Sequence, residues 1–264
     1  MNRSLAPGDL AVASRRLAAV GCIAAEEEAR ELAAVAGDDL ERLATLVERR
    51  TTGEPLAWIT GGVLFGGCQI TVSEGVFVPR WQSESLARRA AELLPARGRA
   101  IDLGTGCGAI ARVLSERRPE ASVLGTEADA GAARCARRNG VTVVEGDLFQ
   151  GVPAGWRGTV DVVVAVLPYV PTSEIAYLPR DVQAFEPILA LDGGEDGLNV
   201  IRRAVSELRG WLRDGGHVLF EIGGDQPAPL TRLLEAQGFG AIRIGLDADG
   251  DPRSIEASAL AMLG

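Results

Sequence analysis

Hydrophobic residues recur at helical spacing through the first fifty positions of the chain. Apolar side chains three or four positions apart lie on one face of a helix, and this spacing predicts three short amphipathic helices over residues 10–21, 25–36 and 40–47. Asp38 is the expected N-cap of the third helix, because its short side chain can accept from a free backbone N–H. We expect the three helices to form a small bundle, either docked on the main domain or reserved for a partner.

The next pattern is a pair of short apolar runs, 63–65 and 68–72, on either side of Gly66 and Gly67. Two-residue hairpin turns need positive φ angles, which glycine adopts without steric cost. The pattern therefore predicts a β-hairpin that joins the helical part to the core.

Beyond the hairpin, short apolar strands alternate with helical segments. The predicted strands are 99–103, 122–127, 141–145, 160–166, 217–222, 241–246 and 255–260, and the predicted helices are 109–116, 131–139, 197–212 and 228–237. Repeated strand and helix units predict an α/β fold with a mostly parallel sheet covered on both faces. Ligands of such folds bind beyond the carboxyl ends of the strands, so the residues that follow each strand are the candidate site.

Length and composition suggest a division of the chain. A chain of 264 residues can hold a core domain with a smaller appendage. Residues 1–50 are rich in Ala, Glu, Arg and Leu, whereas Gly, Val and Pro become frequent after Gly53. We expect an N-terminal helical domain over 1–60, a hairpin linker over 61–80 and the main domain over 81–264.

Charge and cysteine spacing narrow the classes of partner. The formal net charge is −9 and the sequence pI is about 4.9, which argues against a surface that collects nucleic-acid phosphates. The four cysteines are widely spread without a Cys-x-x-Cys pair, so we expect no metal site. We expect the cysteines to be reduced thiols. No apolar run of about 18 residues occurs, so we expect a cytoplasmic protein with no membrane partner.

A glycine-rich turn follows the first strand of the predicted sheet. Glycines at 104, 106 and 108 let the backbone turn tightly and approach a ligand closely. Taken alone, Gly104, Gly106 and Ala109 also fit a dinucleotide fingerprint. Asp102 stands just before the first glycine, where a carboxylate would repel a diphosphate but suits the ammonium group of an amino-acid moiety.

Two further acids follow the next two strands. Glu127 ends the second strand, where a carboxylate can accept both hydroxyls of a ribose. Asp147 follows the third strand, where it can accept from an adenine amino group with Leu148 and Phe149 beside the ring. This order of acid, glycines, acid and acid predicts the class I S-adenosylmethionine (SAM) methyltransferase fold, which has a Rossmann-like sheet. The expected cofactor is SAM, and S-adenosylhomocysteine is what remains of it after methyl transfer. The predicted cofactor-binding residues are Asp102, Gly104, Thr105, Gly106, Gly108, Glu127, Ala128, Asp147 and Leu148.

The chain also resembles the HemK/PrmC family, which methylates the side-chain amide of glutamine in peptide-chain release factors. The similarity runs along nearly the whole chain. It is carried by residues 53–61, the hairpin, 76–80, the glycine loop, 168–171 and 186–198. The resemblance implies a SAM-binding fold, an N-terminal substrate-handling domain and a cleft between the two.

Two departures from the family pattern fall at the substrate end. The family's Asn-Pro-Pro-Tyr segment, whose Asn side chain and neighbouring carbonyl accept from the nitrogen to be methylated, has Val166 and Leu167 in its first two places. An unmatched N–H in a buried site costs about 1–3 kcal/mol. The segment that usually reads Pro-Arg-Pro-Glu-Thr-Glu begins at Pro79 and has Trp81 in place of the second Pro.

These departures predict a more apolar pocket, suited to a flat or hydrophobic small molecule. We therefore expect a methyltransferase of natural-product biosynthesis, and one specific form of this hypothesis is cyclopropane closure from a SAM-derived carbon beside a radical SAM enzyme. Pro168 and Tyr169 would form a platform under the reacting group, and the Leu167 carbonyl would accept one hydrogen bond. The predicted catalytic residues are Val166, Leu167, Pro168 and Tyr169, and the predicted substrate-binding residues are Phe77, Pro79, Trp81 and Tyr169.

Three alternatives remain open at this point. One is the family's ordinary task, glutamine methylation of a release factor. Another is a SAM-binding module without catalysis that holds a partner with its N-terminal helices. Methylation of adenine in nucleic acid is disfavoured by the missing Asn and by the acidic charge.

Overall fold

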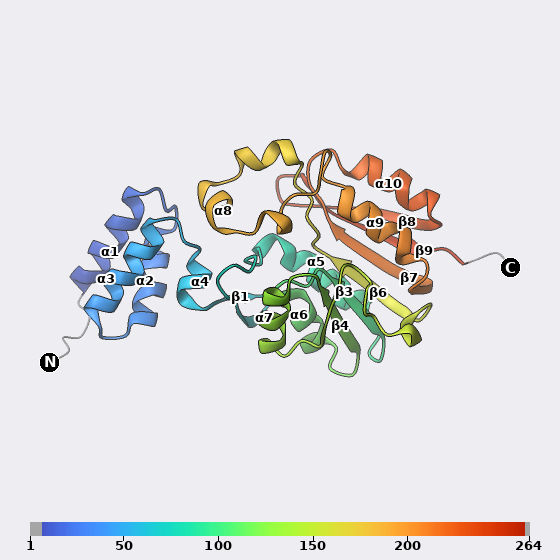
Figure 1. Cartoon of the computed structure of the whole chain (residues 1–264), viewed down its shortest axis with the longest axis horizontal. Coiled ribbons are helices and arrows are strands. Elements are labelled where there is room, and N and C mark those ends of the chain that lie inside the picture. The colour runs from blue at the N-terminus through green and yellow to red at the C-terminus, as the bar shows by residue number, and fades with distance from the viewer. Residues whose placement is uncertain (1–6, 262–264) are drawn as a thin grey trace.

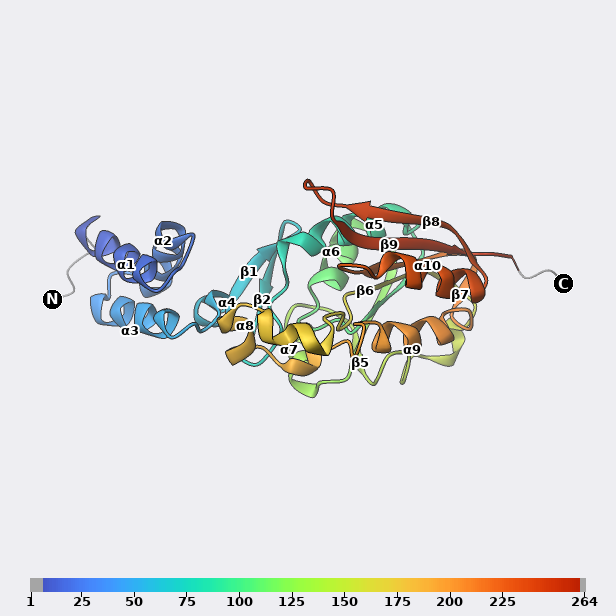
Figure 2. The same ribbon diagram turned by 90° about the horizontal axis from the view of Figure 1, so that it is seen from above.

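The computed structural model describes residues 7–261 and begins with the predicted helical bundle. Helices α1 (Pro7–Ala19), α2 (Ala25–Ala36) and α3 (Leu40–Thr51) pack around a small core in which Leu17 and Leu32 are fully buried. The N-cap of α3 is Asp39 rather than Asp38, because the Asp39 carboxylate accepts from the Arg42 backbone N–H at 2.9 Å. Figures 1 and 2 place this bundle at one end of an elongated molecule.

A short helix and the predicted hairpin connect the bundle to the larger unit. Helix α4 (Leu56–Thr60) leads into β1 (Gly62–Phe65) and β2 (Cys68–Thr71), which pair antiparallel. The Trp58 indole donates to the Val76 carbonyl at 2.9 Å. Phe65 and Ile70 are buried in the same hydrophobic cluster as the helices of the main sheet, so the hairpin packs as part of the larger unit.

The main sheet has seven strands in the order β5-β4-β3-β6-β7-β9-β8. Their bounds are β3 (Arg99–Leu103), β4 (Ser122–Glu127), β5 (Val143–Glu145), β6 (Val160–Ala165), β7 (Leu212–Glu221), β8 (Phe239–Leu246) and β9 (Pro252–Ala259). The first five pair in parallel, and β9 pairs antiparallel with both β7 and β8, which confirms the prediction of a mostly parallel sheet. The chain order reverses between β3 and β6, and ligands of such sheets bind at that point.

Helices cover both faces of the sheet. On one face lie α5 (Glu84–Leu93), α6 (Ala109–Arg117) and α7 (Ala130–Arg138), and on the other lie α9 (Asn199–Leu208) and α10 (Pro227–Ala236). Successive side chains of a strand point to opposite faces. Accordingly, Val162 and Val164 of β6 pack with α5 and α6, whereas Val163 and Ala165 pack with α9. Of these helices, only α5 was absent from the sequence prediction.

A long segment between β6 and α9 holds the 3₁₀ turns η3 (Thr172–Tyr177) and η4 (Ile188–Ala190) on either side of helix α8 (Arg180–Phe185). In Figures 1 and 2 α8 lies beside α4, and the rings of Phe185 and Trp58 meet edge to face with centroids 6.3 Å apart. This segment therefore contacts the connection to the bundle. No helix within residues 7–261 is long and apolar enough to cross a membrane.

Candidate functional site

The glycine loop between β3 and α6 is organised around Asp102. Its side chain is 1% exposed, and its Oδ2 accepts from the Thr105 hydroxyl at 2.6 Å and from the Ala111 N–H at 3.0 Å. Gly108 has a φ of 85°, and a Cβ there would lie 2.8 Å from the Val141 side chain. The loop therefore needs glycine for close packing as well as for its conformation.

Burial sets the protonation of Asp102. Loss of solvent raises the pKa of this carboxyl to about 7, against the opposing effect of the hydrogen bonds from Thr105 and Ala111. The negative charge of Glu127 raises it slightly further. A cation placed nearby would lower the pKa again and draw Asp102 into its anionic form, which suits the ammonium group of an amino acid.

Glu127 ends β4 and is joined to the glycine loop. One carboxylate oxygen accepts from the Gly106 N–H at 2.8 Å, and the other accepts from the Asp129 N–H at 2.9 Å. A carboxylate has about four acceptor positions, so both oxygens can still accept ribose hydroxyls. Ala128, the next residue along, is exposed.

Of the residues that follow β5, Asp147 lies partly exposed at the surface, whereas Leu148 and Phe149 lie in the core. Asp147 forms an ion pair with Arg203 of α9, so an adenine amino group would share this carboxylate. Leu148 is buried, and Phe149 stacks on Trp211 with ring centroids 5.3 Å apart. Phe149 thus belongs to the core beside the predicted adenine site.

The acceptor segment, residues 166–169 after β6, meets the glycine loop because β3 and β6 are neighbouring parallel strands. Leu103 lies opposite Ala165, so the residues that follow both strands emerge side by side. A pocket at this point is lined by Phe65, Phe77, Pro79, Ser83, Asp102, Gly104, Thr105, Gly106, Cys107, Ala109, Ile110 and Val166. It brings predicted cofactor residues together with Phe77, Pro79 and Val166.

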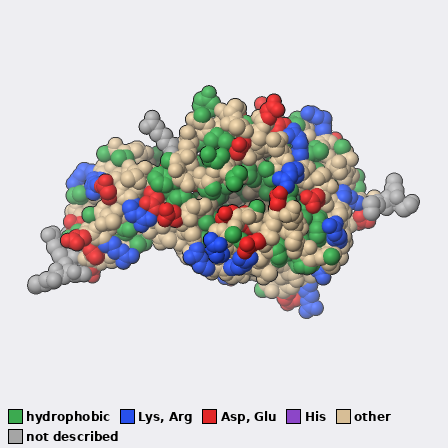
Figure 3. All heavy atoms as spheres, viewed as in Figure 1, with side chains coloured by type: hydrophobic (Ala, Val, Ile, Leu, Met, Phe, Trp, Pro, Cys, Tyr) green, Lys and Arg blue, Asp and Glu red, His purple; other side chains and the backbone are tan. Residues whose placement is uncertain are grey.

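Other predicted residues lie around this pocket rather than in its lining. The Leu167 side chain is buried and comes within 3.0 Å of the position that a Cβ of Gly104 would take. Trp81 is 75% exposed and does not line the pocket, so its indole faces solvent. Figure 3 shows hydrophobic side chains gathered around a hollow near the centre of this face, with charged side chains at its margins.

A buried carboxylate that the sequence analysis missed lies next to the acceptor segment. Glu221 is the last residue of β7 and is 6% exposed. It accepts from the Tyr169 hydroxyl at 3.1 Å and from the Ser83 hydroxyl at 2.5 Å. Burial raises the pKa values of both Glu221 and Tyr169. The signal that could have found it is the one that found Glu127, an acid at the carboxyl end of an apolar strand.

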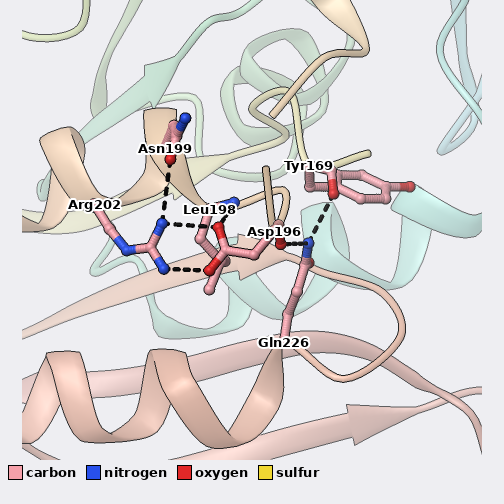
Figure 4. A network of polar contacts seen from close by, with 6 residues as sticks. All are labelled: Tyr169, Asp196, Leu198, Asn199, Arg202 and Gln226. Atoms are coloured by element: carbon pink, nitrogen blue, oxygen red, sulfur yellow. Dashed lines mark hydrogen bonds and ion pairs between the residues drawn. The ribbon is translucent and has the colours of Figure 1, made fainter. Parts of the chain in front are cut away.

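A second missed residue, Gln226, fixes the main chain of the acceptor segment (Figure 4). Its buried amide donates to the Tyr169 carbonyl at 2.7 Å and to the Asp196 carbonyl at 3.3 Å, and its oxygen accepts from the Gly223 N–H at 3.0 Å. A Cβ at Gly197 would lie 2.2 Å from the Tyr169 carbonyl oxygen, so only glycine fits there. The Gln226 amide thus fixes the Tyr169 carbonyl, and the lack of a side chain at Gly197 leaves room for that carbonyl.

Within residues 7–261 no group of three or more His, Cys, Asp and Glu side chains is arranged to hold a metal ion. The four cysteines are free thiols.

The chain is similar over most of its length to known methyltransferases. Residues 73–168 match the family model of the methyltransferase small domain. The release factor glutamine methyltransferase of Geobacter sulfurreducens is 35% identical over 76% of this chain and 72% of its own length. That of Bradyrhizobium diazoefficiens is 34% identical over 83% of this chain and 77% of its own. The structure of a methyltransferase from Pyrococcus furiosus shares the fold, with a TM-score of 0.53, 21% identity and coverage of 74% and 90% of the two chains.

These relatives correct one prediction and confirm others. The prediction of a natural-product acceptor, with or without a radical SAM partner, is wrong, because curated proteins similar over most of the chain are release factor glutamine methyltransferases. The class I fold, methyltransferase activity and SAM as methyl donor are confirmed. The chain belongs to the HemK/PrmC family of SAM-dependent methyltransferases.

Proposed function

We propose that this protein transfers the methyl group of SAM to the side-chain nitrogen of a glutamine in a release factor. The observation that carries the proposal is that the glycine loop and the acceptor segment share one pocket, within a chain whose curated relatives carry out this reaction by name. The acidic net charge and the family membership together argue against nucleic acid as the acceptor.

The residues present fit SAM by their chemistry. Asp102 supplies a carboxyl that a neighbouring ammonium would hold in the charged form. Glu127 has acceptor positions left for ribose hydroxyls, and Gly104 leaves space where a side chain would meet Leu167. SAM supplies a methyl group on a sulfonium, ready for displacement by a nucleophile.

The protein's task in such a displacement is to orient the nitrogen and exclude water. An amide nitrogen is a poor nucleophile, because its lone pair is shared with the carbonyl. Hydrogen bonds from its N–H groups to fixed acceptors help to localise that lone pair toward the methyl carbon. Val166 provides no such acceptor, so the remaining ones must come from main-chain carbonyls such as that of Leu167 and from polar side chains of the pocket.

The domain division supports a protein substrate. We infer a helical domain over 1–60, a hairpin connection over 61–80 and a catalytic domain over 81–264, with the bundle holding the release factor. The bundle has its own hydrophobic cluster and meets the rest of the molecule near α4. A release factor acts in translation, so the proposal places the reaction in the cytoplasm.

The experiment combines purified protein, SAM with a labelled methyl group, and a release factor. We expect label on the release factor and none on a matched release factor whose methylated glutamine is replaced by alanine. Equal labelling of the two would place the methyl group elsewhere and contradict the glutamine assignment.

A further inference from the structure

We propose that Ser83 and Glu221 form a proton relay at the acceptor end of the pocket, in which Ser83 receives the proton lost by the glutamine nitrogen and Glu221 takes the proton of Ser83. This inference rests on the proposed function, because it assigns the acceptor and the base for that reaction.

The first support is that the Ser83 hydroxyl donates its hydrogen to Glu221. Ser83 lies at the end of the 3₁₀ turn η1 (Trp81–Ser83), is 4% exposed and lines the pocket together with Val166. Its oxygen lies 2.5 Å from a Glu221 oxygen, to which it donates its single hydrogen. A serine hydroxyl has one hydrogen and two lone pairs. Ser83 can therefore offer only acceptor positions to a group in the pocket.

The second support is that the partner of Ser83 is a carboxyl group, which carries a negative charge once it is ionised. Hydrogen bonds to an ionised carboxylate are shorter and stronger than neutral ones, and a donor polarised in this way becomes a better acceptor. The Val166 side chain brings no polar atom to the pocket, and the Asp102 carboxylate and Thr105 hydroxyl that also line it are bonded to each other. Among the polar side chains of this lining, the Ser83 oxygen is the acceptor that lies outside the glycine loop.

The surroundings of Glu221 suit a base. Burial is the main influence and raises its pKa, while the hydrogen bonds from Ser83 and Tyr169 and the charges of Arg253 and Arg80 oppose that effect. Both arginines have nearer partners, since Arg80 pairs with Glu186 and Arg253 with Asp247.

Tyr169 is a donor to Glu221 rather than a competing base. Its hydroxyl donates to the other Glu221 oxygen at 3.1 Å. Burial and the negative charge of Glu221 raise the pKa of Tyr169, so this phenol keeps its proton at neutral pH. The oxygen bonded to Ser83 is then the one that receives a proton.

The step balances in atoms and charge. The amide nitrogen forms a bond to the methyl carbon as the bond from carbon to sulfur breaks, and the positive charge moves from sulfur to the amide. One N–H proton passes to the Ser83 oxygen while the Ser83 hydrogen passes to Glu221. The products are neutral S-adenosylhomocysteine, neutral N-methylglutamine and a protonated Glu221, which returns its proton to solvent before the next turnover.

The test is the pH profile of kcat with release factor as substrate. For the unaltered protein we expect kcat to rise with pH through the raised pKa of Glu221, because only the ionised carboxylate can take the proton. Glu221→Gln and Ser83→Ala should each lose this rise and lower kcat by about 100-fold, the lower end of general-base contributions. Ser83→Thr keeps the hydroxyl and should restore both the rate and the profile.

Two further measurements separate the relay from a structural role. The Kd of SAM, measured by calorimetry, should stay within about twofold in Ser83→Ala and Glu221→Gln, since neither side chain is assigned to the cofactor. Tyr169→Phe removes a hydrogen bond that favours ionised Glu221, so the rise in kcat should move to higher pH. This shift decides the matter even if Glu221→Gln fails to fold.

The results that would overturn the relay differ from those that would overturn the function. An active protein whose pH profile is unchanged in Ser83→Ala and in Tyr169→Phe refutes the relay and leaves the function standing. An unaltered protein that leaves the release factor unmodified refutes the function, and the relay with it.

Discussion

The buried carboxyl of Asp102 predicts that the protein loses stability as the pH rises toward neutrality. Its pKa is about 7 in the folded protein, against an ordinary value near 3.8. The folded state therefore holds a proton that the unfolded state has released throughout this interval. Stability falls with pH wherever the folded state binds more protons, so this group stabilises the fold at acidic pH and that contribution is lost as the pH rises through about 7.

The magnitude follows from the size of the pKa difference. One pKa unit corresponds to about 1.4 kcal/mol, so the whole interval is worth about 4 kcal/mol. In an experiment between pH 5 and pH 8, stability changes mainly from pH 5 up to the folded pKa of about 7. That interval is about two pH units, which corresponds to about 3 kcal/mol. Asp102→Asn keeps an acceptor for Thr105 and Ala111 but cannot ionise, so the variant should lack this loss.

The assay is urea denaturation of the cofactor-free protein at pH 5 and pH 8. Relative to Asp102→Asn, the unaltered protein should lose about 3 kcal/mol of unfolding free energy between the two pH values. Asp39→Asn is the matched control, because asparagine also caps a helix well and the buried carboxyl remains. Parallel pH dependence in the unaltered protein and Asp102→Asn would refute the reasoning.

Three further substitutions test the rest of the site. Glu127→Ala should weaken SAM binding by about 10- to 100-fold, the worth of hydrogen bonds to a charged group, and unchanged affinity in calorimetry would contradict its role at the ribose. Val166→Asn restores an acceptor worth about 1–3 kcal/mol and should raise kcat on release factor at least about fivefold without changing the Kd of SAM; a lower rate would show that the side chain points away from the amide. Gln226→Ala leaves the Tyr169 carbonyl without its buried donor, so it should lower the free energy of unfolding by about 1–3 kcal/mol, and a stability equal to that of the unaltered protein would show that the network in Figure 4 is not needed.

The sequence predicted those parts of the fold and site that depend on residues close together in the chain. The turn after β3 places Asp102, Thr105 and the glycines within a few positions of one another, and their spacing alone indicates a close approach to a ligand. Helix α5 went unpredicted although Leu86, Ala87 and Ala90 have helical spacing and face the core. Its signal is weak because small alanines carry little hydrophobic contrast.

The parts that could not be predicted join residues far apart in the chain. Ser83 and Glu221 are separated by 138 positions, and only the sheet order brings the end of β7 beside the entrance to α5. The side chain of Val166, considered alone, predicts a different substrate because it offers no hydrogen-bond acceptor. The pocket around it holds the buried hydroxyl of Ser83, which a reading of the acceptor strand alone does not reveal.

The most direct test of the central claim is the mass of the release-factor peptide that contains the substrate glutamine. After incubation with the purified protein and SAM, we predict a gain of one methyl group on that peptide, located on the glutamine side chain by fragmentation. The protein should leave the glutamine-to-alanine release factor unmodified. An unchanged mass of the glutamine peptide, under conditions where the protein binds SAM, would contradict the proposed function.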